Sequence, residues 1–88
     1  MVIEVKKPTP DELKRLGVDT WDIWTCDPST FDWSYSDREM CYFLAGRVTV
    51  KTADQEVTFG KGDLVTFPKG LSCRWTVHEA VRKHYRFG

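Results

Sequence analysis

The chain has 88 residues, 14% of them aromatic and 30% charged, and thirteen acidic side chains balance thirteen basic ones to a formal net charge of zero. A chain of this length is expected to form one domain, residues 1–88, with a modest core. The neutral balance excludes the electrostatic pattern of a protein that binds nucleic acid or an anionic membrane.

No apolar run in the chain is long enough to span a bilayer, and the opening residues, MVIEVKKPTP, contain no apolar signal segment. The three cysteines have no CxxC spacing and no common zinc pattern. We therefore expect a cytoplasmic protein with reduced thiols.

The first predicted elements are a short strand at residues 2–5, VIEV, and the only helix, at about residues 10–16. Thr9 is expected to cap the helix, and Glu12 stands three residues later to complete a capping box. Pro10 suits the first helical position, and Gly17 is expected to end the helix. This helix is expected to cap one end of a sheet.

From about residue 20 to residue 88, strand patterns alternate with turn residues. The predicted strands are WDIWTC (21–26), TFDWSY (30–35), REMCYFLA (38–45), RVTVKT (47–52), EVTF (56–59), LVTF (64–67), LSCRWTV (71–77) and AVRKHYRF (80–87). Gly46 and a turn at Glu79 are expected to separate neighbouring strands. Short strands at roughly ten-residue spacing predict an all-β sandwich or barrel.

One acidic residue, Glu39, falls on the apolar side of its strand, in phase with Cys41 and Phe43. An unpaired carboxylate in an apolar interior is costly, so such a residue usually has a partner or a task. In the last strand, Lys83 shares the apolar phase of Val81, and we predict that it pairs with Glu39.

Two segments of the sequence resemble the two motifs of the cupin family. Glu39 is followed after six residues by Gly46, and Gly62 is followed by five residues, Pro68, one residue and Gly70. The segments CYFLAGRVTV, KGDLVTFPKGLSCRW and VRKHY resemble small stand-alone cupins of the ureidoglycine aminohydrolase-like group. This resemblance implies a cupin double-stranded β-helix, a jelly-roll barrel with one short N-terminal helix.

The resemblance also concerns a metal site. In metal-binding cupins, histidines occupy the positions of Trp33, Tyr35 and Cys73, and only the glutamate of the motif is kept here, as Glu39. The resemblance therefore implies a degenerate site, and we expect no metal and no other cofactor. The alternative is an ion held by Glu39, Tyr35, Cys73 and Cys41.

Strand alternation and the motif positions together predict a candidate site inside the barrel. Its members are Trp33, Tyr35, Glu39, Cys41, Phe43, Cys73, Trp75 and Lys83. The aromatic residues, with Trp24, either form core or line a pocket for a small planar or sugar-like molecule, whose amine would meet Glu39.

Three functions remain open. The leading hypothesis is a metal-independent cupin that binds a small-molecule ligand in the barrel. The second is an enzyme that uses Glu39 as an acid or base or as a metal ligand. The third is a structural homodimer that pairs through the strand at residues 2–5.

A cysteine nucleophile, Cys41 or Cys73, would need a base. His84 is out of phase with the interior, and His78 is expected to be exposed beside the turn at Glu79. We therefore interpret the two thiols as small buried apolar groups.

Overall fold

The computed structural model describes residues 1–88, and nearly all of its regular structure is strand. In chain order the elements are β1 (Glu4–Lys6), α1 (Pro10–Leu16), the 3-10 helix η1 (Val18–Thr20), β2 (Asp22–Cys26), β3 (Ser29–Ser34), β4 (Glu39–Lys51), β5 (Glu56–Gly60), β6 (Leu64–Phe67) and β7 (Ser72–Phe87). All seven strands belong to one antiparallel sheet with the order β1-β6-β4-β7-β2, and β3 also pairs with β7 and β5 with β4. This is a rolled all-β sheet with one short N-terminal helix, as the strand spacing predicts and as the resemblance to cupins implies.

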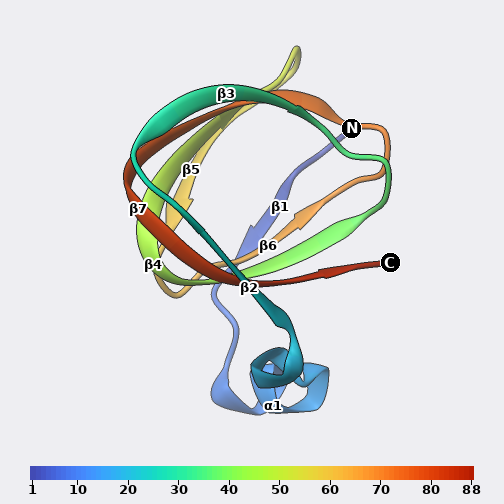
Figure 1. Ribbon diagram of the computed structural model, residues 1–88. Helices are drawn as coiled ribbons and strands as arrows, with labels where there is room; N and C mark the ends of the chain where they lie inside the picture. The colour runs from blue at the N-terminus through green and yellow to red at the C-terminus, as the bar shows by residue number, and fades with distance from the viewer.

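The two long strands β4 and β7 organise the sheet. They pair with each other along most of their lengths. The first part of β4 also pairs with β6 and its second part with β5, while β7 pairs first with β3 and then with β2. Because β4 and β7 are strongly curved, the sheet rolls around a common interior (Figure 1).

The helix α1 forms as predicted and lies outside the rolled sheet, at one end of it (Figure 1). The Thr9 hydroxyl accepts from the Glu12 amide at 3.2 Å, the Glu12 carboxylate accepts from the Thr9 amide at 3.4 Å, and Gly17 ends the helix with φ +67°. No helix of the structure has the length and the apolar character that crossing a membrane requires.

The helix covers a small apolar cluster on the outer face of the sheet. Its members are Val18, Trp21, Leu64, Leu13, Leu16, Met40 and Tyr42. On β4, Met40 and Tyr42 alternate with residues that point into the barrel. Both faces of this part of β4 are therefore covered, the inner face in the main core and the outer face partly, by the helix and its cluster.

The predicted strand end at Gly46 is wrong, because β4 continues through Gly46 to Lys51. The pairing of β4 with β7 shifts register between Phe43 and Val48, as at a β-bulge. The buried positions accordingly change from Cys41 and Phe43 to Val48 and Val50. The bulge thus lets both halves of one long strand face the same interior.

The predicted turn at Glu79 is also absent. β7 continues from Ser72 to Phe87, and Glu79 lies opposite Arg47 in the irregular part of the β4–β7 pair. The predicted first strand is shifted as well, because β1 spans Glu4–Lys6 rather than residues 2–5. Ile3, just before it, exchanges backbone hydrogen bonds with the side chain of Gln55 instead of with a strand.

The bulge at Gly46 yields a prediction about stability. Gly46 has φ +103°, and a Cβ atom there would lie 2.7 Å from the carbonyl oxygen of Ala80. Gly62 has a similar φ, +88°, but a Cβ atom there would meet nothing within 4 Å. We expect Gly62→Ala to lower the free energy of unfolding by about 1–2 kcal/mol, the cost of left-handed backbone alone. We expect Gly46→Ala to lower the free energy of unfolding by roughly 1–3 kcal/mol more than that, because the two strands must also move apart at the bulge.

Urea unfolding of the two variants and the unmodified chain measures this difference. Equal losses in both variants would show that the close approach of β4 and β7 at Gly46 contributes nothing to stability.

Candidate functional site

The predicted ion pair between Glu39 and Lys83 is present in the interior of the barrel. The Lys83 Nζ atom on β7 lies 3.4 Å from Glu39 Oε2 on β4, and the two side chains are only 5% and 6% exposed. Lys83 Nζ also lies 3.1 Å from the sulfur of Cys41. Each buried charge therefore has a partner of opposite sign, which a low-dielectric interior requires.

Aromatic rings surround the ammonium group. Lys83 Nζ lies 4.8 Å from the ring centroid of Trp24, 4.9 Å from that of Trp75 and 5.9 Å from that of Phe43. The faces of aromatic rings attract cations, and the attraction is stronger where water is excluded. The rings and the carboxylate of Glu39 therefore stabilise the same positive charge.

The ion pair forms part of the wall of a cavity of about 460 Å³. Nine residues line the cavity: Trp24, Phe31, Trp33, Tyr35, Glu39, Trp75, Lys83, Tyr85 and Phe87. Glu39 and Lys83 are the only charged members, and the other seven are aromatic. The cavity thus combines apolar walls with one pair of opposite charges.

Five of the predicted site residues lie in this lining, and three lie behind it or beside it. Cys41 and Phe43 are completely buried in the core under the ion pair, and Cys73 contacts the carbonyl oxygen of Trp33 across the β3–β7 pair. Trp33 itself was expected to point into the interior, but half of its surface is exposed. It lies at the open side of the cavity rather than in the core.

Three residues of the lining were missed by sequence reasoning, although their strand phase indicated them. Phe31 shares its phase with Trp33 and Tyr35 on β3 and the loop after it. Tyr85 and Phe87 share the phase of Lys83 on β7. The alternation that places Lys83 inside applies equally to these rings.

Tyr35 is the main neutral polar group of the lining. Its hydroxyl oxygen accepts a hydrogen bond from Trp75 Nε1 at 3.2 Å, and its ring stacks on Phe67 with centroids 4.8 Å apart. Burial, reinforced by the nearby charge of Glu39, raises the pKa of Tyr35 far above its ordinary value. The hydroxyl therefore keeps its proton and can donate it in a hydrogen bond.

The thiols are placed where they react poorly. Burial raises the pKa of Cys41 to about 12, although the charge of Lys83 opposes the rise, and burial also raises the pKa of Cys73. Only the thiolate is an effective nucleophile, so both shifts make these thiols poorer nucleophiles than an ordinary cysteine. Neither histidine faces them, because His84 Nδ1 lies 3.2 Å from the carbonyl oxygen of Trp21 and His78 is exposed.

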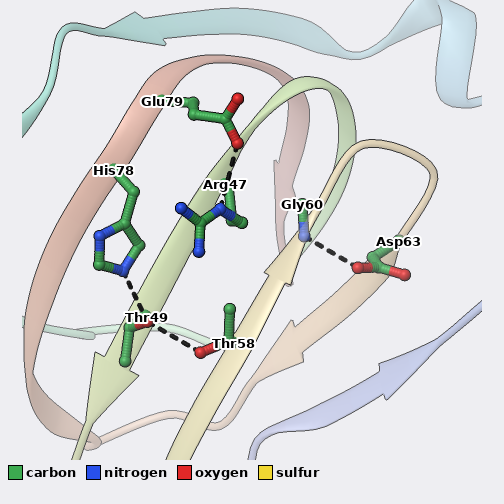
Figure 2. Close-up of polar contacts among 7 residues, drawn as sticks. All are labelled: Arg47, Thr49, Thr58, Gly60, Asp63, His78 and Glu79. Carbon is green, nitrogen blue, oxygen red and sulfur yellow. Dashed lines mark hydrogen bonds and ion pairs between the residues drawn. The ribbon is translucent and has the colours of Figure 1, made fainter.

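A second group of polar contacts crosses β7, β4 and β5 away from the cavity lining. His78 Nε2 lies 2.8 Å from Thr49 Oγ1, which in turn lies 2.8 Å from Thr58 Oγ1; Figure 2 shows the three side chains joined across the strands. Arg47 and Glu79 form an exposed ion pair in the same region. These are exposed cross-strand contacts, of the kind that stabilises neighbouring strands.

The donor set around Glu39 does not fit the metal centre of a metal-binding cupin. The structure contains no group of three or more His, Cys, Asp or Glu side chains that could hold a metal ion. Where such cupins have imidazoles, this chain has Trp33, Tyr35 and Cys73. The ammonium of Lys83 stands beside the one remaining carboxylate and would repel a metal cation.

The rolled antiparallel sheet and its interior cavity define a small cupin barrel. The family model described as the EutQ-like cupin domain matches residues 13–85, and the chain belongs to this family. The match does not single out the ureidoglycine aminohydrolase-like group within the cupins.

Solved structures agree with this assignment. The crystal structure of a DUF861 family protein from Thermotoga maritima is 52% identical to this chain, covers 99% of it and is itself covered completely, with a TM-score of 0.97. The EutQ protein of Clostridium difficile is 25% identical over 74% of this chain and 52% of its own, with a TM-score of 0.68.

Among curated proteins, the chain is 27% identical to acetate kinase EutQ of Clostridioides difficile (strain 630) over 77 residues. The similarity covers 88% of this chain and 47% of that protein. The chain thus spans about half the length of the curated relative that it matches.

The ion pair yields a prediction about stability. Glu39→Gln and Lys83→Met each leave one buried charge without its partner, and we expect each to lower the free energy of unfolding by about 3–5 kcal/mol. The double variant leaves no unpaired charge and is expected to be more stable than either single variant. Urea unfolding measures all three, with Asp32→Asn as the matched control from the exposed pair of Asp32 and Arg74.

The control is expected to leave the free energy of unfolding almost unchanged, because exposed ion pairs contribute little to stability. Simple additivity of the two buried substitutions would contradict an interaction between Glu39 and Lys83.

The thiols yield a prediction about alkylation. At pH 8, a thiol with a pKa of about 12 is ionised in about one molecule in ten thousand, so iodoacetamide should not label Cys41 in the folded protein. Partly exposed Cys26 should be labelled, and unfolding in guanidinium should release all three thiols. Peptide mass spectrometry identifies the labelled cysteines. Rapid labelling of Cys41 in the folded chain would contradict this prediction and support the hypothesis that Cys41 is a nucleophile.

Proposed function

We propose that this protein binds a small organic molecule in the aromatic cavity of its barrel, without a native metal ion. The observation that carries the proposal is the cavity of about 460 Å³ with seven aromatic residues and one buried ion pair in its wall. Ligand sites in proteins typically enclose about 300–1,000 Å³ and combine apolar walls with a few oriented polar groups.

The open side of the cavity supports the proposal. Trp33 and Phe87 are about half exposed, although both rings are large and apolar. They lie in the same lining as the buried rings of Tyr35 and Trp75. Exposed apolar surface that continues into a cavity is typical of binding sites, and a ligand in the cavity would remove part of it from water.

The absence of a metal is part of the same proposal. It is supported by the ammonium of Lys83, which neutralises Glu39 in the place where a metal ion would need the carboxylate.

The kinase activity in the name of the longer curated relative is not part of the proposal. Phosphoryl transfer depends on cationic groups that hold the phosphates of the donor. Lys83 is the one cationic side chain of the cavity wall, and its charge is already neutralised by Glu39.

We propose that this binding occurs in the cytoplasm. The three free cysteines support this location, because thiols stay reduced in that compartment.

The experiment is a small-molecule library screened by thermal shift and then by calorimetry, with Trp33→Ala as the site variant. Trp33 is half exposed, so its loss should leave the fold intact while removing one wall of the cavity. Ile23→Ala is the matched control, because Ile23 is a partly exposed apolar residue of β2 outside the lining. We expect ligands to bind the Trp33→Ala variant about ten-fold more weakly, and the control unchanged.

Elemental analysis of protein purified without an affinity tag completes the test and should find no stoichiometric metal. A stoichiometric metal ion would overturn the metal-free part of the proposal. A library without binders, or binders that ignore Trp33→Ala, would overturn the binding function of the cavity.

A further inference from the structure

We infer that the ligand of the cavity is an uncharged planar molecule whose head group places a hydrogen-bond donor beside an acceptor, as a carboxamide does. This inference rests on the proposed function and specifies the chemical class of the ligand. It follows from the charges, the free hydrogen-bonding positions and the ring faces that the cavity presents.

The charges in the wall disfavour a charged ligand. The only two, on Glu39 and Lys83, lie 3.4 Å apart and cancel each other at a short distance. An anionic head group beside Lys83 also lies close to the carboxylate, and a cationic one beside Glu39 also lies close to the ammonium. Because both side chains are almost completely buried, solvent screens these repulsions poorly, and desolvating a charged ligand adds a further cost.

Glu39 offers an unused acceptor. Its Oε2 atom accepts from Lys83, and the Cys41 thiol also hydrogen-bonds to the carboxylate. A carboxylate has about four lone-pair positions. Glu39 lines the cavity, so its carboxylate borders the space that a ligand would occupy. A ligand N–H group can therefore complete this carboxylate.

Lys83 and Tyr35 bring donors to the lining of the same cavity. The ammonium of Lys83 has three N–H groups, and its hydrogen bonds to Glu39 and Cys41 use two of them. The hydroxyl of Tyr35 accepts from Trp75, while its own hydrogen has no acceptor in the protein. A carbonyl oxygen of the ligand can accept from either group, next to the position where its N–H group donates to Glu39.

The ring faces favour a planar body. Phe31 and Trp75 are stacked at 5.9 Å with an angle of 16° between their planes, and Trp24 meets Trp75 edge-on at 5.9 Å. Planar rings bury the most area against such walls and stack on them favourably. The ligand class is therefore a flat ring that carries a carboxamide or an equivalent neutral donor–acceptor edge.

The experiment compares four probes with the same ring and different head groups: benzamide, benzoate, benzylamine and toluene. Calorimetry at pH 7 measures their affinities for the unmodified protein. We expect benzamide to bind at least ten-fold more tightly than benzoate and benzylamine, because only its head group is neutral with both a donor and an acceptor. Toluene should also be weaker, because it leaves Glu39 and Tyr35 without partners.

Charge variants invert the expected order. Glu39→Gln leaves Lys83 as the only charge, so benzoate should gain at least ten-fold relative to benzamide. Lys83→Met leaves Glu39 as the only charge, so benzylamine should gain instead. The order of the four probes on the unmodified protein decides the inference even if these destabilised variants fail to fold. Trp33→Ala should weaken benzamide binding and Ile23→Ala should not, which places the probe in the cavity.

Benzoate or benzylamine binding as tightly as benzamide to the unmodified protein would overturn the inference, and so would a complete lack of binding by all four probes. Neither result contradicts the proposed function. That function is contradicted only if the library also yields no ligand whose binding depends on Trp33.

Discussion

The interior of this barrel depends on one buried pair of opposite charges. An ammonium or a carboxylate alone would be prohibitively costly at this depth, so Lys83 and Glu39 can be buried only together. The rings of Trp24, Trp75 and Phe43 reinforce the ammonium. The same rings make the interior apolar, which strengthens the attraction within the pair. The aromatic wall therefore stabilises the ion pair, and the pairing of the two charges allows them to be buried beside apolar rings.

The sheet places this pair through two long strands. Glu39 lies near the start of β4 and Lys83 in the second half of β7, where the strands are paired. The bulge around Gly46 keeps both halves of β4 facing the interior, although the strand changes phase there. A straight strand of the same length would turn one half of its apolar residues outward. The curvature that closes the barrel and the position of the ion pair are thus parts of one arrangement.

Membership of the EutQ-like cupin family sets the context for this interior. The glycines of the two cupin motifs, Gly46, Gly62 and Gly70, are present and adopt positive φ. The ligand positions of metal-binding cupins instead hold Trp33, Tyr35 and Cys73. The barrel therefore keeps the glycines of the motifs, and the ammonium of Lys83 is the partner of the motif glutamate in its interior.

The sequence alone determined the features that depend on local chemistry or on simple alternation. The capping residues Thr9 and Glu12 specify the helix, and strand phase was enough to predict that Lys83 meets Glu39. Only the tertiary structure decided whether Gly46 ends a strand or bends it, because a glycine with positive φ serves a turn and a bulge equally well and pairing with β7 selects the bulge. It also decided that Trp33 stands at the open side of the cavity while Trp75 lies deep. Strand phase shows which face of the sheet a side chain occupies, but its depth depends on how far the rolled sheet closes over it.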